Sequence, residues 1–123
     1  MTGCLLVSVV DDDESVRDSL PDLLRLFGFA AQGFSSAEAF LTSDVVDQTS
    51  CLLLDIAMAG MSGLDLQQEL KRRRLRIPIV FITAQGDETL RPRLLARGAA
   101  GCLFKPFSES ALLEALDAAL RIG

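Results

Sequence analysis

The segment CLLLDI, residues 51–56, is the most informative part of this chain about its architecture. Its first residues are all apolar, without the alternation of polar residues that marks a strand with one face in water. Such a run predicts a strand covered on both faces, as at the centre of a parallel sheet. The run stops at Asp55, so a carboxylate is expected at the carboxyl end of this central strand.

Similar apolar runs lie on both sides of this segment, and helical spacing of apolar residues separates them. The predicted strands are 5–10, a weaker 29–34, 51–56, 77–83 and 99–104. The predicted helices are 15–27, 35–41, 63–73, one from about Arg91 to 97, and one from Ser108 onward. Strands that alternate with helices predict an α/β fold with a parallel sheet and helices on both faces. Right-handed crossovers reduce this to a doubly wound, five-stranded sheet, most simply of order 2-1-3-4-5.

Several residues mark the ends of the predicted helices. Gly28 is expected to end the first helix, and Pro21 within it is expected to kink it. Ser35 and Glu38 have the spacing of a capping box, and Ser108 is placed to cap the last helix. No linker, repeat or low-complexity segment interrupts the pattern, so residues 1–123 are predicted to form a single domain.

Composition excludes several classes of protein. The net charge of −5, from 12 basic and 17 acidic residues, argues against a general nucleic-acid surface. The one basic cluster, KRRRLR (71–76), is interpreted as a solvated helix end or as a charge contact with a partner. No apolar run is long enough to cross a membrane, and the N-terminus lacks the basic region and cleavage site of a secretory signal. A cytoplasmic location is therefore expected.

The chain has three cysteines, none in a CxxC pair, and no histidine. The usual zinc sites and any catalysis that needs histidine as a base are therefore excluded. An odd number of cysteines in a cytoplasmic chain favours free, buried thiols.

Polar residues gather where the predicted strands end. Asp11 and Asp12 follow the first strand, Asp55 ends the third, Thr83 the fourth and Lys105 the fifth. In a doubly wound sheet these ends border one crevice, where ligands bind. Asp12 and Asp55 can share a Mg²⁺ ion, which prefers oxygen ligands, while Lys105 and Thr83 can contact an anionic oxygen. This is a site for a hard cation and a phosphoryl group.

Plainer roles exist for these residues. The acids after the first strand can simply stabilise the N-terminus of a helix, Thr83 can cap the following loop, and Lys105 can be a solvated side chain. The adjacent Asp13 and Glu14 are assigned to that helix start and not to the crevice.

The motifs VVDDDESVR, LLLDIAMAGMSGLDL, VFITA and FKPF resemble, in this order and spacing, the receiver domain of bacterial two-component response regulators. The resemblance covers the whole chain and implies a CheY-like fold. SSAEAFL and KPF are most similar to receivers of the FixJ type, which usually precede a LuxR-type DNA-binding domain.

The resemblance implies a role for each residue of the crevice. Asp55 is implied as the phosphoacceptor, and Mg²⁺ as the cofactor. Asp12, Asp55 and the backbone carbonyl of Ala57 are implied as metal ligands, and Asp11 acts through water.

For the phosphoryl group, the resemblance implies that Thr83 and Lys105 each contact one of its oxygens. It also implies a cis peptide bond between Lys105 and Pro106. Ala57 and Gln85 flank the expected position of this group, so the lifetime of the acyl phosphate is expected to depend on both.

Partners follow from the same resemblance. The phosphoryl donor is a sensor histidine kinase, or a small acyl phosphate, because the chain itself has no histidine. The output is expected to be transcriptional, through a domain that this chain lacks; the end at ALRIG favours a fragment over a single-domain regulator. The resemblance also admits a homodimer that forms on phosphorylation, with no direct contact to nucleic acid or membrane. It implies a phosphoacceptor and not a turnover enzyme.

The chain departs from the family's pattern at a few positions. Ala59 replaces a usual proline, so the loop after Asp55 is expected to be less rigid. Cys102 replaces a usual aromatic residue that turns inward on activation, and Pro92 shortens a helix of the same surface. We therefore expect the phosphorylation chemistry to be intact and the output switch to be altered.

Three alternatives use similar folds. One is an adaptor that works without phosphorylation, which the full set of crevice residues opposes. A second is a Mg²⁺-dependent phosphatase, which needs an acid two residues after the nucleophile, where this chain has Ala57. A third is a flavodoxin-like cofactor carrier, which needs a phosphate loop where this chain has acids.

Overall fold

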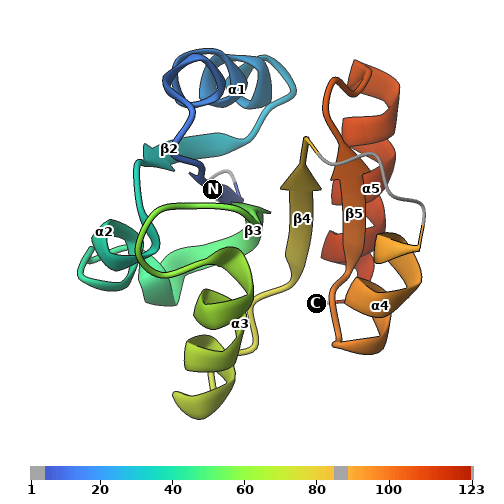
Figure 1. Cartoon of the computed structure of the whole chain (residues 1–123). Coiled ribbons are helices and arrows are strands. Elements are labelled where there is room, and N and C mark those ends of the chain that lie inside the picture. Colours follow the sequence, from blue (N-terminus) through green and yellow to red (C-terminus); the bar gives the residue numbers. More distant parts are fainter. Residues whose placement is uncertain (1–4, 85–88, 123) are drawn as a thin grey trace.

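A computed structural model describes residues 5–84 and 89–122, which form a parallel sheet with helices on both faces (Figure 1). The strands are ordered β2-β1-β3-β4-β5, and every pair of neighbours is parallel, as the sequence predicted. Their bounds are β1 Leu6–Val10, β2 Ala30–Phe34, β3 Thr49–Asp55, β4 Ile79–Thr83 and β5 Gly101–Phe104.

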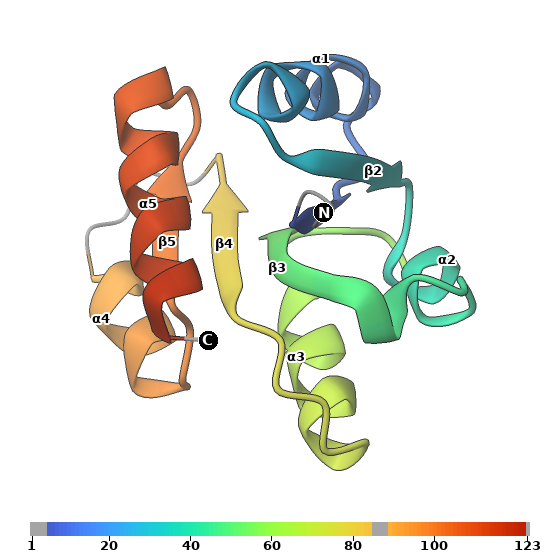
Figure 2. The same ribbon diagram turned by 180° about the vertical axis from the view of Figure 1, so that it is seen from behind.

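The helices divide between the two faces of the sheet. They are α1 (Glu14–Leu26), α2 (Ala37–Leu41), α3 (Gly63–Arg72), α4 (Leu90–Ala96) and α5 (Glu109–Ile122), with a short 3₁₀ turn at Val46–Gln48. The side chains of α2, α3 and α4 share one hydrophobic core, and those of α1 and α5 share another. Figure 1 is seen from the side of α3 and α4, and Figure 2 from the side of α5.

The central strand β3 explains the continuous apolar run. Leu52 and Leu54 belong to the core under α2, α3 and α4, whereas Cys51 and Leu53 belong to the core under α1 and α5. All four side chains are fully buried, because alternate residues of a strand face opposite sides and here both sides are covered by helices.

Most of the predicted helix ends are confirmed. Gly28 follows α1 with a φ of 96°, and the Ser108 hydroxyl accepts a hydrogen bond of 3.0 Å from the Ala111 amide at the start of α5. Pro92 lies in the first turn of α4, where a missing amide costs least. The first helix runs through Pro21, and a bend of its axis there stays a prediction.

The predicted capping box at Ser35 is wrong by one residue. Ser36 is the N-cap of α2, and its hydroxyl accepts a hydrogen bond of 3.0 Å from the Ala39 amide. Glu38 does not close a capping box; its carboxylate accepts a hydrogen bond of 3.2 Å from the amide of Met61, in the loop after β3.

The remaining sequence features take the expected places. Cys51 and Cys102 are free and buried, and burial raises the pKa of the Cys51 thiol to about 12. The basic cluster 71–76 begins in the last turn of α3, where Arg72 and Arg73 both bind Glu69. Among the described residues, no helix has the length and hydropathy needed to span a bilayer.

Candidate functional site

Three carboxylates meet at the carboxyl ends of β1 and β3. Carboxylate oxygens of Asp11, Asp12 and Asp55 lie within 4.8 Å of one another. Asp11 is fully buried and Asp55 almost so, whereas Asp12 is exposed. Two buried acids thus lie beside one that is open to solvent, so the predicted acidic group is assembled as a unit.

Lys105 balances part of this negative charge. It follows β5, and its Nζ donates a hydrogen bond of 2.7 Å to Oδ2 of Asp11. Burial alone would lower the pKa of Lys105, but the hydrogen bond and charge of Asp11, together with the charge of Asp55, raise it. Lys105 therefore stays protonated, and Asp11 is the acid with which it forms an ion pair.

One ammonium group does not neutralise three carboxylates. Burial and the charge of Asp11 raise the pKa of Asp55 to about 7, although Lys105 acts in the opposite direction. Crowded oxygen ligands that hold a proton near neutral pH are a donor set that fits a hard divalent cation such as Mg²⁺, because the cation relieves the repulsion.

Thr83 is brought beside Lys105 by the register of the last two strands. Thr83 ends β4 opposite Phe104, and the Lys105 amide donates a hydrogen bond of 2.8 Å to the Thr83 carbonyl. The peptide bond between Lys105 and Pro106 is cis, as predicted. Thr83 is itself buried.

The acidic run 11–14 divides at the strand end. Asp13 is the N-cap of α1: its Oδ1 accepts hydrogen bonds from the Ser15 hydroxyl (2.8 Å) and amide (3.0 Å), and these bonds lower its pKa. Glu14 is the first residue of the helix. The amide of Asp13 in turn donates to Oδ1 of Asp11 at 2.9 Å, so the helix start also orients the buried acid.

Gly63 contacts the end of β3 at the site, although none of the sequence motifs indicated this contact. It begins α3, and a Cβ atom built on it would lie 2.3 Å from the carbonyl oxygen of Asp55. Its amide donates a hydrogen bond of 2.9 Å to the Ile56 carbonyl, which pulls the helix start against the end of β3. A glycine at the first position of a helix, where no turn requires it, was the signal in the sequence.

Glu38 is a second residue whose contact the sequence did not reveal. Its bond to the Met61 amide joins α2 to the loop that carries Ala57. Ala57 itself is exposed on this loop, and the role of its carbonyl as a ligand stays a prediction. Gln85, the other residue predicted to flank the phosphoryl group, lies outside the described residues.

Two of the positions that depart from the family pattern, Cys102 and Pro92, lie in β5 and in the first turn of α4. Cys102 is buried in the middle of that strand, opposite Phe81 of β4. The guanidinium of Arg91, in the first turn of α4, lies 5.2 Å from the centre of the Phe104 ring. This cation–π contact joins α4 to β5 beside the cysteine.

Comparison with known proteins agrees with this geometry. Residues 7–117 match the model of the response regulator receiver domain. Nodulation protein W of Bradyrhizobium diazoefficiens is 46% identical over 93% of this chain and 50% of its own length, and the transcriptional regulatory protein TdiR of Thauera aromatica is 41% identical over 95% of this chain and 52% of its own. The chain thus spans about half the length of the curated relatives it matches.

Solved structures are similar as well. The response regulator StyR superposes with a TM-score of 0.87 and 46% identity, covering 98% of this chain and 61% of that one. The structure of FixJ-N superposes with a TM-score of 0.84 and 34% identity, covering 98% of this chain and 96% of that one.

Proposed function

The chain belongs to the response regulator receiver family, and from this we propose that Asp55 is its phosphoacceptor. The observation that carries the proposal is the cluster of Asp55 with Asp11 and Asp12, next to the ammonium group of Lys105. The same positions of the sequence match the family's motif, and the geometry supports this assignment.

Asp12, Asp55 and the backbone carbonyl of Ala57 would hold Mg²⁺, and Asp11 would act through water. When bound, this ion neutralises charge on the carboxylates and on the phosphoryl oxygens. The acidic cluster and the raised pKa of Asp55 support the choice of a divalent cation.

In the phosphotransfer step, a carboxylate oxygen of Asp55 attacks the phosphorus atom of the donor. The bond between phosphorus and the donor breaks, and its electron pair leaves with the donor: a histidine nitrogen of a kinase, which takes up a proton, or the carboxylate of a small acyl phosphate. The product on this chain is an aspartyl phosphate. Asp55 must be ionised to attack, and a cation held by these carboxylates would favour that ionised form.

Thr83 and Lys105 would bind the transferred group. The Thr83 hydroxyl would donate a hydrogen bond to one phosphoryl oxygen, and the Lys105 ammonium would pair with another. Phosphoryl transfer mainly requires that the group be positioned and its charge neutralised. These two side chains would do both, and no separate general base is needed.

The whole protein would relay the phosphorylated state to an output. The relatives named above include a transcriptional regulatory protein, so we propose a sensor histidine kinase as donor, a DNA-binding output domain of LuxR type and a cytoplasmic location. A homodimer that forms on phosphorylation belongs to the same proposal.

Intact-mass measurement after incubation with acetyl phosphate and Mg²⁺ tests the assignment. Wild type should gain one phosphoryl group, Asp55→Ala should gain none, and Glu14→Ala should behave like wild type because Glu14 lies in the helix and not in the crevice. An adduct on Asp55→Ala, or none on wild type, would overturn the proposal.

A further inference from the structure

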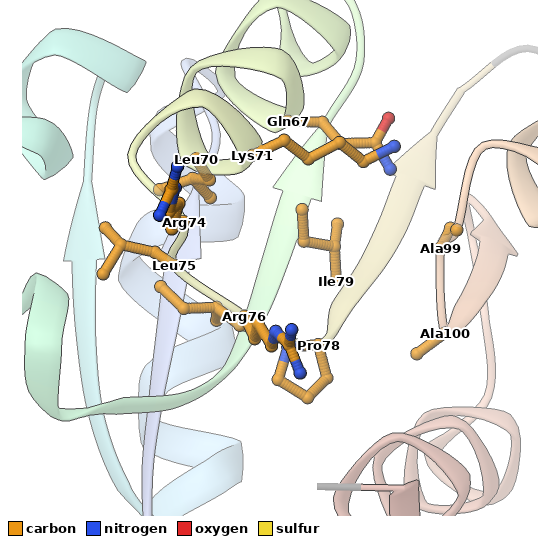
Figure 3. Close-up of a pocket in the computed structure, with 12 residues that line it drawn as sticks. Gln67, Leu70, Lys71, Arg74, Leu75, Arg76, Pro78, Ile79, Ala99 and Ala100 are labelled. Atoms are coloured by element: carbon orange, nitrogen blue, oxygen red, sulfur yellow. The ribbon is translucent and has the colours of Figure 1, made fainter.

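A concave region lies at the amino ends of the strands, opposite the carboxyl ends where the acids lie. It is a groove of about 970 Å³ between the end of α3, the start of β4 and the turn before β5 (Figure 3). Its surface is apolar along the floor and basic along the rim. The floor includes Leu70, Leu75, Pro78, Ile79 and Ala99, and the rim carries Lys71, Arg74 and Arg76.

Within residues 5–84 and 89–122, no carboxylate neutralises the basic rim. None of the groove's lining residues, all within the described part of the chain, is acidic. The neighbouring Arg72 and Arg73 bind Glu69, but no ion pair of Arg74 or Arg76 occurs among the described residues. Lys71 donates its hydrogen bond of 2.7 Å to the neutral carbonyl of Arg97. Three positive charges therefore remain at one groove of a chain whose net charge is −5.

Arg74 occupies a backbone position that does not favour it. Its φ is 60°, in the left-handed region, at the turn that ends α3. The amide of Leu75, the residue after Arg74, donates a hydrogen bond to the Leu70 carbonyl and closes this turn. The turns that end α1 and α4 are closed in the same way, with Gly28 and Gly98 at the position of Arg74. Those helices use glycine, which takes this conformation without strain, so the turn itself does not call for an arginine at position 74.

The side of the groove near α3 is held rigidly. Gln67 is buried, and its amide group donates a hydrogen bond of 3.0 Å to the Arg97 carbonyl and accepts one of 3.3 Å from the Arg97 side chain. Figure 3 shows Gln67 and Lys71 reaching from α3 toward the segment with Ala99, above Ile79. These bonds join α3 to the turn before β5, so the groove is formed before any partner arrives.

We propose that this groove binds an acidic segment of another protein, with apolar side chains on the floor and carboxylates at Lys71, Arg74 and Arg76. Charge complementarity selects an acidic partner. The groove is open to solvent and so encloses too little of a small molecule, and its lining lacks the aromatic side chains on which nucleic-acid bases stack. The proposal does not depend on Asp55, and it gives a function to the basic cluster 71–76.

Fluorescence anisotropy with a labelled synthetic peptide tests the proposal. The peptide has a central pair of leucines flanked by aspartates and glutamates, and a control peptide has serines in place of the leucines. The double variant Arg74→Gly/Arg76→Gln should bind the leucine peptide about fivefold more weakly than wild type. Glycine suits the φ of position 74, so this variant should keep its fold, which circular dichroism and thermal melting will check. Arg25→Gln, on α1, is the matched control and should bind like wild type.

Binding of the leucine peptide should also exceed that of the serine peptide, and it should weaken as salt is raised. Equal affinity of the double variant and wild type, equal affinity for the two peptides, stronger binding of duplex DNA, or no binding at all would each overturn the proposal. A loss of peptide binding with normal phosphorylation of Asp55 leaves the proposed function intact, so the two proposals fail separately.

Discussion

Asp55→Asn should make the protein more stable at pH 8 when no divalent cation is present. The ordinary pKa of the carboxyl group is 3.8, and in the folded chain burial and the charge of Asp11 raise it to about 7. The folded state therefore keeps a proton that the unfolded state has lost, and stability falls as the pH rises from about 4 to about 7. Above about pH 7 this decrease in stability is complete.

The size of the effect follows from the two pKa values. A difference of about three pH units, at 1.36 kcal/mol for each, gives about 4 kcal/mol. Asp12 leaves the crevice open to water, which screens the charges, so we expect about 2 kcal/mol. The asparagine variant should thus exceed wild type by about 2 kcal/mol at pH 8 and by almost nothing near pH 4.

Urea unfolding of both proteins between pH 4 and pH 8, in EDTA, measures this difference. Glu114→Gln, an exposed carboxylate changed to an amide on α5, is the control and should show little dependence on pH relative to wild type. Saturating Mg²⁺ should close the gap at pH 8, because an ion that binds the folded state stabilises it and wild type offers the better site. If the asparagine variant is no more stable than wild type at pH 8, the raised pKa of Asp55 is refuted.

Three further predictions follow from the site. Gly63→Ala should cost about 2 kcal/mol in urea unfolding, because its Cβ would overlap the Asp55 carbonyl, whereas Gly101→Ala, whose Cβ would make only ordinary contacts, should cost less; equal losses would contradict the close approach. Lys105→Met should bind Mg²⁺ more tightly by calorimetry, since a cation leaves the site, and yet accept phosphate from acetyl phosphate more slowly; unchanged values for both would exclude Lys105 from it. Beryllofluoride with Mg²⁺ should bind but should change the NMR shifts around Cys102 little compared with a relative that has an aromatic residue at this position, and a large shift of the segment 91–97 would refute an altered switch.

The fold was predictable because the central strand is covered by helices on both faces, so all of its core residues must be apolar. Leu52 and Leu53 face opposite cores, and a run of such residues has no other common explanation in a chain of alternating elements. The position of the candidate site follows from the fold: in a parallel sheet, the polar residues that end the strands lie together at the carboxyl ends.

Contacts between elements were not predictable in the same way. Ser35 and Ser36 are equally good caps by type, and the burial of Ala37 and Phe40 decides for the second. The bond from Glu38 to Met61 spans 23 positions, and no local pattern indicates it. The close approach of Gly63 to Asp55 depends on how α3 meets the sheet, which only packing determines.

The ion pair between Lys105 and Asp11 limits how the site can respond to phosphorylation. These residues are 94 positions apart, and the ammonium group lies 2.7 Å from a fully buried carboxylate. A phosphoryl group on Asp55 adds negative charge that competes with Asp11 for the same ammonium. If Lys105 turns to the new group, Asp11 loses its partner and depends more strongly on the metal ion for its charge. The same movement would act on the start of the segment between β5 and α5, so this segment is where the proposed phosphorylation of Asp55 would first affect the rest of the chain.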